Sequence, residues 1–397
     1  MVQTAPRGER LNIGLFGRRN VGKSSLLNAL CEQRVSIVSD MAGTTTDAVS
    51  KIYELVPVGP VTFFDTAGID DTGDIGILRI GATQKILNKV DIALLVTDEK
   101  GIGEHENALI KTFNDLNIPF ILVFNKSDLN NSFDDACTFC PSIRVCASKS
   151  ENIERLKQLI KDSVPEYAKT TPALVRDLIQ PEQTVICIAP IDTSAPKGRL
   201  ILPQVQVIRD ILDASACAFV VQNDNDVLNA LRNLKEPPAL TITDSQLVRQ
   251  VNSVLPPEIP LTTFSTLFAR YKGDLKLLYE GAARLKTLND NDRILIAEAC
   301  SHHAQEDDIA RVKIPNLIKK FLGKDIRFEW SAGNDFPADI QKYKVVIHCG
   351  GCMLSRLETL RRLNECVRNG VPVTNFGMAI SAMQGILERV VQPFGLK

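Results

Sequence analysis

The feature that most constrains the fold is an alternation, along the whole chain, of short apolar runs rich in β-forming residues with amphipathic stretches of helical period. Helical stretches lie between most of the runs, which is the pattern of a parallel sheet wrapped by helices. The sequence therefore predicts an α/β fold. In the N-terminal part, the runs that predict strands are residues 11–16, 61–66, 92–97, 119–125 and 143–148.

The alternation resumes beyond a polar stretch at residues 165–183, which contains three prolines and is typical of a linker. We expect three α/β units, an N-terminal domain followed by two smaller ones. The runs that predict strands in this part are residues 184–190, 217–222, 239–244, 292–299, 326–330, 343–348 and 371–376. The expected domains are residues 1–168, 169–268 and 269–397.

Composition and charge exclude several classes of protein. The 46 Lys and Arg residues nearly balance the 47 Asp and Glu residues, which does not suit a chain that coats nucleic acid or an anionic membrane. Ten cysteines in 397 residues are too few for a disulfide-built scaffold. The first residues do not form a secretory signal, and no apolar stretch approaches the length of a membrane span. We therefore expect a cytoplasmic protein with neither nucleic-acid nor membrane partners.

A phosphate-binding loop follows the first strand-like run. Residues 17–24, GRRNVGKS, match the pattern GxxxxGK(S/T) and stand between a strand-like run and a helical stretch, as this motif requires. Gly17 and Gly22 allow backbone N–H groups to close around phosphates. We expect Lys23 to reach the β- and γ-phosphates and Ser24 to bind Mg²⁺. The other loop residues predicted to bind the nucleotide are Asn20, Val21 and Ser25.

Two further motifs complete the phosphate side of this site. Asp65 to Gly68 form a DxxG element at the end of a strand-like run. Asp65 is expected to hold Mg²⁺ through water, and the Gly68 N–H to sense the γ-phosphate. Thr45, in the GTTTD segment at residues 43–47, is the predicted switch ligand of Mg²⁺. The apolar Ile69 gives the attacking water no partner, so we expect slow intrinsic hydrolysis.

The base side of the site lies at two later strand ends. Asn125, Lys126 and Asp128 belong to an NKxD motif that reads guanine. The Asp128 carboxylate can accept hydrogen bonds from the guanine N1–H and 2-amino groups, which adenine does not offer, so discrimination is large. Cys146 and Ala147 end another run, where the Ala147 N–H is expected to meet the guanine O6.

Together, these ordered elements resemble the translation-factor-like GTPases, in the branch of the tRNA-modification and ribosome-assembly GTPases. The resemblance covers about residues 10–165 and implies a P-loop domain that hydrolyses GTP with Mg²⁺. Asn20 and the GTTTD segment resemble members of this branch that bind K⁺ at the phosphates. It therefore implies hydrolysis stimulated by K⁺, with the cation in the place of an arginine finger.

Three of the four histidines lie within a few residues of a cysteine. Cys300 and His302 follow one strand-like run, while His348, Cys349 and Cys352 follow another, and α/β sheets bind ligands at such carboxyl ends. Three thiolates fit an iron–sulfur cluster with one incompletely bound iron. Cys300, His302, Cys349 and Cys352 also fit a closed zinc site. Buried cysteines are common in cores as well, so the spacing alone leaves all three readings open.

The pattern C-x-H, a gap of about 45 residues and then H-C-x-x-C, behind an N-terminal GTPase, resembles the FeFe-hydrogenase maturation GTPases, the HydF family. This resemblance spans the whole chain. It implies a 4Fe–4S cluster on Cys300, Cys349 and Cys352 with a labile fourth iron position. The candidates for that position are the motif histidines His302 and His348 and the acidic residues Glu298 and Asp335.

The same resemblance implies a scaffold and carrier with a GTPase switch. The protein would hold the di-iron precursor of the hydrogenase H-cluster and deliver it to the FeFe-hydrogenase apoprotein. Two radical S-adenosylmethionine maturases would act upstream, and residues 184–265 would form a homodimer. The alternative is a ribosome- or tRNA-acting GTPase with a structural zinc site, which the near-zero net charge disfavours.

Overall fold

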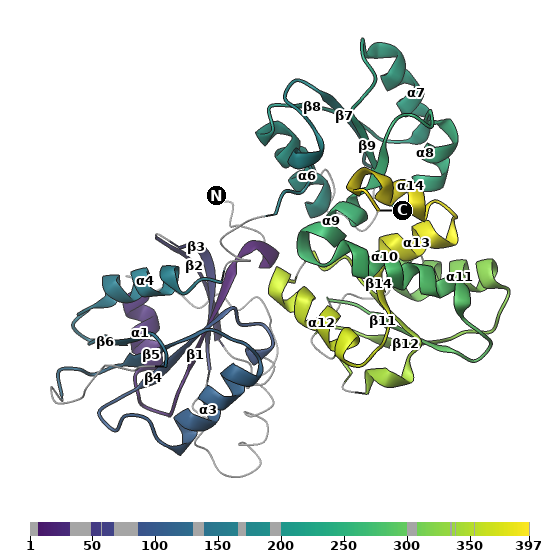
Figure 1. Ribbon diagram of the computed structural model, residues 1–397. Helices are drawn as coiled ribbons and strands as arrows, with labels where there is room; N and C mark the ends of the chain where they lie inside the picture. Colours follow the sequence, from purple (N-terminus) through teal and green to yellow (C-terminus); the bar gives the residue numbers. More distant parts are fainter. Residues whose placement is uncertain are drawn as a thin grey trace. The chain divides into compact units, whose positions relative to one another are not determined.

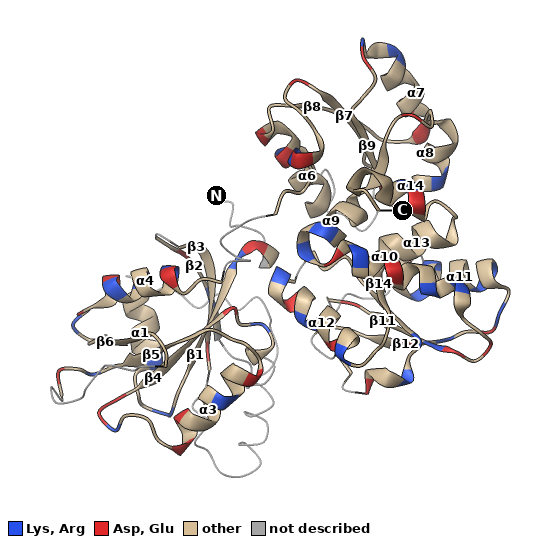
Figure 2. Cartoon of the chain, in the orientation of Figure 1, with Lys and Arg blue, Asp and Glu red and all other residues tan. Residues whose placement is uncertain are grey.

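In the computed structural model, the described residues form two compact units, Met1–Thr171 and Pro172–Lys397 (Figure 1). The described residues are 7–31, 49–56, 58–66, 86–129, 139–165, 172–190, 200–299, 308–333, 336–337, 339–352 and 354–396. None of the helices in these ranges is long and apolar enough to cross a membrane. Lys and Arg are interspersed with Asp and Glu along the helices of both units (Figure 2).

The described part of the N-terminal unit contains a six-stranded sheet in the order β2-β3-β1-β4-β5-β6. Its strands are β1 (Leu11–Phe16), β2 (Val49–Leu55), β3 (Gly59–Asp65), β4 (Ile92–Thr97), β5 (Phe120–Phe124) and β6 (Ser142–Arg144). The five strands expected in this part are confirmed, and all of them pair in parallel. The edge strand β2, antiparallel to β3, was not predicted, because its apolar residues are interrupted by polar ones.

Three described helices cover the two faces of this sheet: α1 (Lys23–Leu30), α3 (Glu104–Asp115) and α4 (Ile153–Asp162). Leu27 of α1 and Leu156 of α4 share a buried cluster with Ile13 of β1. Phe16, on the opposite face of the same strand, packs edge-on against Phe113 of α3, with ring centroids 5.2 Å apart. The period of two along β1 thus supplies two separate cores.

Among its described residues, the second unit contains two four-stranded parallel sheets, β10-β9-β7-β8 and β12-β11-β13-β14. The strands of the first are β7 (Thr184–Ile188), β8 (Cys217–Val221), β9 (Leu240–Thr243) and β10 (Leu261–Thr263). Those of the second are β11 (Arg293–Ala297), β12 (Arg327–Ser331), β13 (Val345–His348) and β14 (Val373–Asn375). Every strand predicted for this part is therefore present.

The helices of this unit pack around a hydrophobic core that includes residues of both sheets, such as Ile186 of β7 and Ile296 of β11. The helix α13, FGMAISAM, is buried at seven of its eight positions and therefore lacks the amphipathic period by which helices are predicted. The helices are α6 (Leu202–Asp213), α7 (Asp224–Asn233), α8 (Val248–Val254), α9 (Phe264–Lys272), α10 (Leu275–Arg284), α11 (Ile314–Leu322), α12 (Arg356–Arg368), α13 (Phe376–Met383) and α14 (Leu387–Val391).

The first residues of this unit are held by two charged side chains. The Asp210 carboxylate on α6 accepts hydrogen bonds from three successive backbone N–H groups, those of residues 174–176, at 3.1, 2.7 and 2.9 Å. Arg270 on α9 donates to the Asp177 carboxylate at 2.9 and 2.7 Å. Its guanidinium also donates to the carbonyls of Ala173 and Leu174. Residues 173–177 are therefore fixed from both sides.

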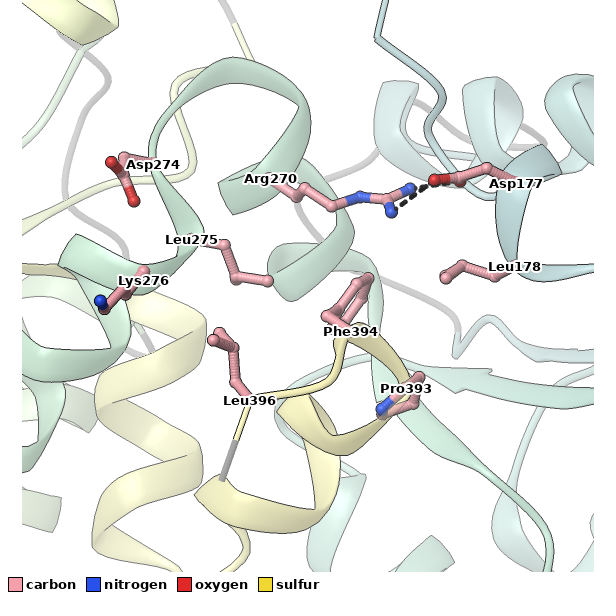
Figure 3. A pocket seen from close by; sticks show the side chains of 9 residues that line it. All are labelled: Asp177, Leu178, Arg270, Asp274, Leu275, Lys276, Pro393, Phe394 and Leu396. Atoms are coloured by element: carbon pink, nitrogen blue, oxygen red, sulfur yellow. Dashed lines mark hydrogen bonds and ion pairs between the residues drawn. The ribbon is translucent and has the colours of Figure 1, made fainter.

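Arg270 and Asp177 also line a cleft of about 450 Å³ (Figure 3). The ring of Phe394, which also lines the cleft, lies 5.1 Å from the Arg270 guanidinium. Leu275 and Leu396 supply apolar lining. Residues from the start and from the end of the second unit thus line the same cleft as Arg270 of α9.

Replacing Asp210 with alanine is expected to lower the free energy of unfolding of the second unit by about 1–3 kcal/mol, because three backbone N–H groups lose their acceptor. Trp330, in β12, is the one tryptophan of the chain, so its fluorescence in a urea titration reports this unit. Asp213→Ala, one turn further along α6, removes only an exposed pair with Arg209 and serves as the control. Equal effects of the two variants would contradict the role given to Asp210.

Candidate functional site

The phosphate loop connects the end of β1 to the start of α1. Gly17 has φ +136° and Gly22 has φ +92°, values that side chains rarely allow. A Cβ atom at Gly17 would lie 2.1 Å from the Val96 carbonyl oxygen, and one at Gly22 would lie 2.3 Å from the Asn125 side-chain nitrogen. Both glycines of the motif are therefore required by close packing of the loop against β4 and against the residue that follows β5.

Lys23 curls back over this loop. Its side chain is buried, and its Nζ donates hydrogen bonds to the carbonyls of Gly17 and Arg18, each at 2.7 Å. The ammonium group thus lies within the loop to which the sequence assigns the phosphates. Of the neighbouring predicted ligands, Val21 is buried and Ser25 is exposed on α1. Asn20 has φ +62°, a left-handed conformation that asparagine tolerates.

The predicted magnesium side is described in part. The Ser24 hydroxyl donates a hydrogen bond of 2.6 Å to the Asp65 carboxylate, so β3 and the start of α1 bring these two predicted residues together. Hydroxyl and carboxylate oxygens are the ligand types that Mg²⁺ prefers. Thr45 and Gly68, like Ile69, lie outside the described residues.

On the base side, Asn125 links the loops around the site. Its side-chain amide donates to the Val21 carbonyl at 2.9 Å, and its oxygen accepts from the Ala147 N–H at 3.1 Å. Asn125 therefore ties the phosphate loop to the segment that contains Cys146 and Ala147. Both the nitrogen and the oxygen of its amide group therefore make contacts within the site.

Asp128 presents a partly exposed carboxylate beside that segment. A hydrogen bond from Cys146, together with the Lys149 ammonium group 3.3 Å away, lowers the pKa of Asp128. The carboxylate is therefore ionised at neutral pH and acts only as an acceptor, as recognition of two guanine N–H groups requires. Lys126 has φ +59°, and its Nζ lies 3.8 Å from the Asp98 carboxylate.

Arg18 is a member of this site that the motif does not indicate. Its Nε lies 2.8 Å from the fully buried Glu106 carboxylate of α3, and its Nη2 donates to the Gly101 carbonyl at 3.0 Å. Glu106 also accepts from the Gly103 N–H at 2.9 Å and so caps its own helix. Arg18 fills a variable position of the pattern, and its partners lie more than eighty residues further along the chain, so no local signal predicts this anchor.

In the second unit, parallel pairing brings the ends of β11 and β13 together. β11 and β13 are neighbours, with Ala297 opposite His348. The Cys349 N–H donates to the Ala297 carbonyl at 2.8 Å, and the Ala299 N–H donates to the Cys349 sulfur at 3.1 Å. A donated N–H favours the thiolate form of a cysteine, which is the form that binds metals.

Cys349 and Cys352 are half-buried and form part of the glycine-containing loop at residues 349–352, termed here the cysteine loop. Gly351 in this loop has φ +64°, and the buried Lys272 of α9 donates to carbonyls at its end. Within the described ranges, no three His, Cys, Asp or Glu side chains gather as a metal site. Cys300 and His302 lie in the undescribed residues 300–307, and Asp335 is also undescribed.

His348 is buried at the end of β13, and both of its ring nitrogens contact the protein. Nδ1 lies 2.7 Å from the Cys349 carbonyl, and Nε2 lies 3.3 Å from a guanidinium nitrogen of Arg362 on α12. Burial, followed by the positive charge of Arg362, lowers the pKa of His348 to about 4. The imidazole is therefore neutral at pH 7, and binding of a metal by it would require one of these two contacts to break.

Glu298, the other described candidate for the fourth position, is buried directly after β11. Its carboxylate lies 3.4 Å from the Arg311 guanidinium, which also lies over the Trp330 ring. The remaining cysteines behave as core residues where they are buried. Burial raises the pKa of Cys187 and Cys366 to about 12 and that of Cys31 to about 11, so they are neutral thiols.

Curated relatives match the N-terminal part of the chain. The GTPase Der of a Nitratiruptor species is 38% identical over 179 residues, which cover 41% of this chain and 38% of that protein. The tRNA modification GTPase MnmE of a Prochlorococcus marinus strain is 42% identical over 138 residues, covering 33% of this chain and 29% of that protein. The chain thus spans less than two fifths of the length of these relatives.

Among solved structures, the G domain of the T. maritima FeoB iron transporter matches with a TM-score of 0.31 and 21% identity. The match covers 39% of this chain and 99% of the FeoB G-domain chain. A variant of Aquifex aeolicus Era bound to GDP and AlF4⁻ matches with a TM-score of 0.31 and 20% identity, covering 56% of this chain and 97% of that one.

Three family models match successive parts of the chain. Residues 12–126 match the 50S ribosome-binding GTPase model, so the N-terminal unit contains a P-loop GTPase domain. Residues 174–273 match the hydrogen maturase F dimerization domain, and residues 276–393 match the hydrogen maturase F tetramerization domain. The last two models together account for more than half of the 397 residues. The chain therefore belongs to the hydrogen maturase F family.

Proposed function

We propose that this protein is a GTP-hydrolysing scaffold in hydrogenase maturation, which holds the di-iron precursor of the H-cluster and delivers it to the FeFe-hydrogenase apoprotein. The observation that carries the proposal is the junction of β11 and β13, where the Ala299 N–H reaches the Cys349 sulfur at 3.1 Å. Membership of the hydrogen maturase F family supports the same role.

The proposed cofactor of the second unit is a 4Fe–4S cluster held by Cys300, Cys349 and Cys352. The described residues fit such a group, because two half-buried thiols follow one strand and the adjacent strand supplies an N–H donor to one of them. A cluster bound by three thiolates keeps one iron open to an exchangeable ligand, which is what a scaffold for a di-iron unit needs. His302, His348, Glu298 and Asp335 remain the proposed ligands for that iron.

In the N-terminal unit, we propose that Lys23 and the glycines of the loop bind the phosphates of GTP, while Ser24, Thr45 and Asp65 hold Mg²⁺. The hydrogen bond from Ser24 to Asp65 and the position of Lys23 support this arrangement. Gly68 would sense the γ-phosphate, and Asn20 would bind K⁺ in a slow, K⁺-stimulated hydrolysis. Asp128, Lys126 and the Ala147 N–H would read the guanine. GTP turnover would then govern the exchange of partners instead of iron chemistry.

We further propose a homodimer that forms along β8 in the dimerization-domain region. β8 is one of the two edge strands of its described sheet, and the exposed fraction of Val220 is 44%. Val205 and Leu212 on α6 are exposed by 48% and 53%, which is unusual for large apolar side chains. A second copy of β8 would add backbone hydrogen bonds along the edge that this strand presents among the described residues, and it would cover these side chains by a self-complementary contact.

The proposed upstream partners are two radical S-adenosylmethionine maturases, and the proposed location is the cytoplasm. The described cysteines are all free thiols, as expected in a reducing compartment. The second candidate function is a ribosome- or tRNA-acting GTPase with a structural zinc site, which the match to a 50S ribosome-binding GTPase model favours for the N-terminal unit alone.

Lys23→Ala is expected to lower the rate of GTP hydrolysis by about 100-fold or more, because a preorganised cation at the phosphates is lost. Uptake of iron and sulfide should be unchanged, since the cysteine loop belongs to the other unit. Both are measured on the same preparation, by phosphate release and by metal analysis. Lys111→Ala, at an exposed position of α3, is the control. Loss of iron uptake in Lys23→Ala would contradict independent sites.

Cys349→Ser and Cys352→Ser are each expected to lower the iron and sulfide bound after anaerobic reconstitution, together with the visible absorption of the cluster. Cys217→Ser, at an exposed position of β8, should bind the full amount. A colourless chain that binds zinc through the same cysteines would favour the second candidate function. Infrared carbonyl and cyanide bands on the chain, after co-expression with the maturases, would test its role as a carrier.

Val220→Lys is expected to weaken self-association by about tenfold or more, because it places a charge in the proposed interface. Sedimentation velocity over a range of concentrations measures the change. Val56→Lys makes the same substitution at a 73% exposed position of the N-terminal unit and should leave association unchanged. If Val220→Lys associates like the unsubstituted chain, the interface lies elsewhere.

A further inference from the structure

Lys272 is a buried cation on the helix beside the cysteine loop. It is the last residue of α9, and only 3% of it is exposed. Its Nζ donates to the carbonyls of Gly351, Cys352 and Leu354, at 2.9, 3.2 and 2.8 Å. The first two acceptors lie at the end of the cysteine loop and the third just beyond it, some eighty residues away in the sequence. Lys272 is therefore a long-range anchor for the backbone of the loop.

The three bonds also define the charge of this group. A protonated lysine has three N–H donors, whereas a neutral amine has two and a lone pair that would face a carbonyl oxygen. Since three carbonyls surround Nζ, the geometry assigns the ammonium form. A full positive charge therefore lies in contact with the backbone of the loop that contains Cys352.

The loop has particular need of an anchor. Gly350 and Gly351 lose more conformational freedom on folding than other residues, and Gly351 adopts φ +64°. Because a trans peptide group points its C=O and N–H in opposite directions, a Gly351 carbonyl turned toward Lys272 turns the N–H of Cys352 to the other side of the loop. Lys272 thus fixes both the shape of the loop and the direction of its donors.

We propose that Lys272 is a positioning residue for the iron–sulfur site, which preforms the cysteine loop and raises the reduction potential of the cluster bound there. The inference rests on the proposed function, in that a cluster binds Cys349 and Cys352. Such a cluster is anionic when three thiolates bind it, and reduction adds negative charge. A nearby buried cation stabilises the reduced state more than the oxidised state and so raises the potential.

The anchor comes from a different part of the fold than the loop. Phe264, Leu267 and Phe268, on the same helix as Lys272, belong to the core of the β7–β10 sheet. α9 lies within the match to the dimerization domain, and the cysteine loop lies within the match to the tetramerization domain. Through Lys272, the geometry of the proposed iron–sulfur site therefore depends on the region that matches the dimerization domain.

The test uses the full chain with Lys272→Met, which removes the charge and the donors, and Lys272→Gln, which keeps two N–H donors without the charge. Lys276→Met, at an exposed position of the next helix, is the matched control. Hydrogen exchange of residues 349–354 is measured in the metal-free chain. After reconstitution, the reduction potential and the rate of iron loss to a chelator are measured.

For Lys272→Met, we expect faster exchange in the cysteine loop, a lower reduction potential, and iron loss faster by about 10- to 100-fold. In Lys272→Gln, hydrogen exchange of the loop should be partly slowed again, because two N–H donors remain, but the reduction potential should stay low, because the charge is absent. The comparison therefore separates the positioning effect of Lys272 from the effect of its charge. Lys276→Met should match the unsubstituted chain in all three measurements.

Loop exchange and potential in Lys272→Met equal to those of the unsubstituted chain would overturn the inference. If Lys272→Met does not fold, Lys272→Gln decides the question by the same two measurements. If the unsubstituted chain binds no iron and sulfide, the proposed cluster and the effect on its potential are both overturned, while exchange of the loop still tests the positioning role.

Discussion

Parallel pairing decides where the chemistry of this chain lies, because parallel strands that are neighbours end on the same edge of their sheet. In the N-terminal unit, the phosphate loop follows β1, Asp65 ends β3, and Asn125 follows β5. In the second unit, the adjacent strands β11 and β13 bring Ala299 to the Cys349 sulfur. Residues that are far apart in the sequence therefore meet at these sheet edges.

Both candidate sites depend on a second device, a buried cation bound to backbone carbonyls. Lys23 donates to the carbonyls of Gly17 and Arg18, and Lys272 donates to three carbonyls at the cysteine loop. Arg362 similarly donates to the Gly333 carbonyl while it contacts His348. In the phosphate loop and the cysteine loop, these hydrogen bonds restrict backbone that glycine would otherwise leave free to adopt many conformations.

Most of the fold could be predicted because buried parallel strands appear as continuous apolar runs, as in β4 and β5. Those patterns are absent from the interrupted edge strand β2 and from α13, which is buried at seven of its eight positions. Ser24 with Asp65 and Asn125 with Ala147 could be predicted from motifs. The anchors Arg18 and Lys272 could not, since their partners lie far away in the sequence. Outside the described residues, Thr45, Gly68, Cys300 and His302 stay predictions.

The last turn of α9 holds two segments at once. Arg270 binds residues 173–177, near the start of the second unit, and Lys272 binds the cysteine loop. Side chains two residues apart on a helix are separated by a rotation of about 200°, so they point to nearly opposite sides of the helix. This turn of α9 therefore lies between the two segments that it binds. A change in the position of this single turn would therefore alter two contacts at once, the one that holds the first residues of the second unit and the one that holds the backbone of Cys352.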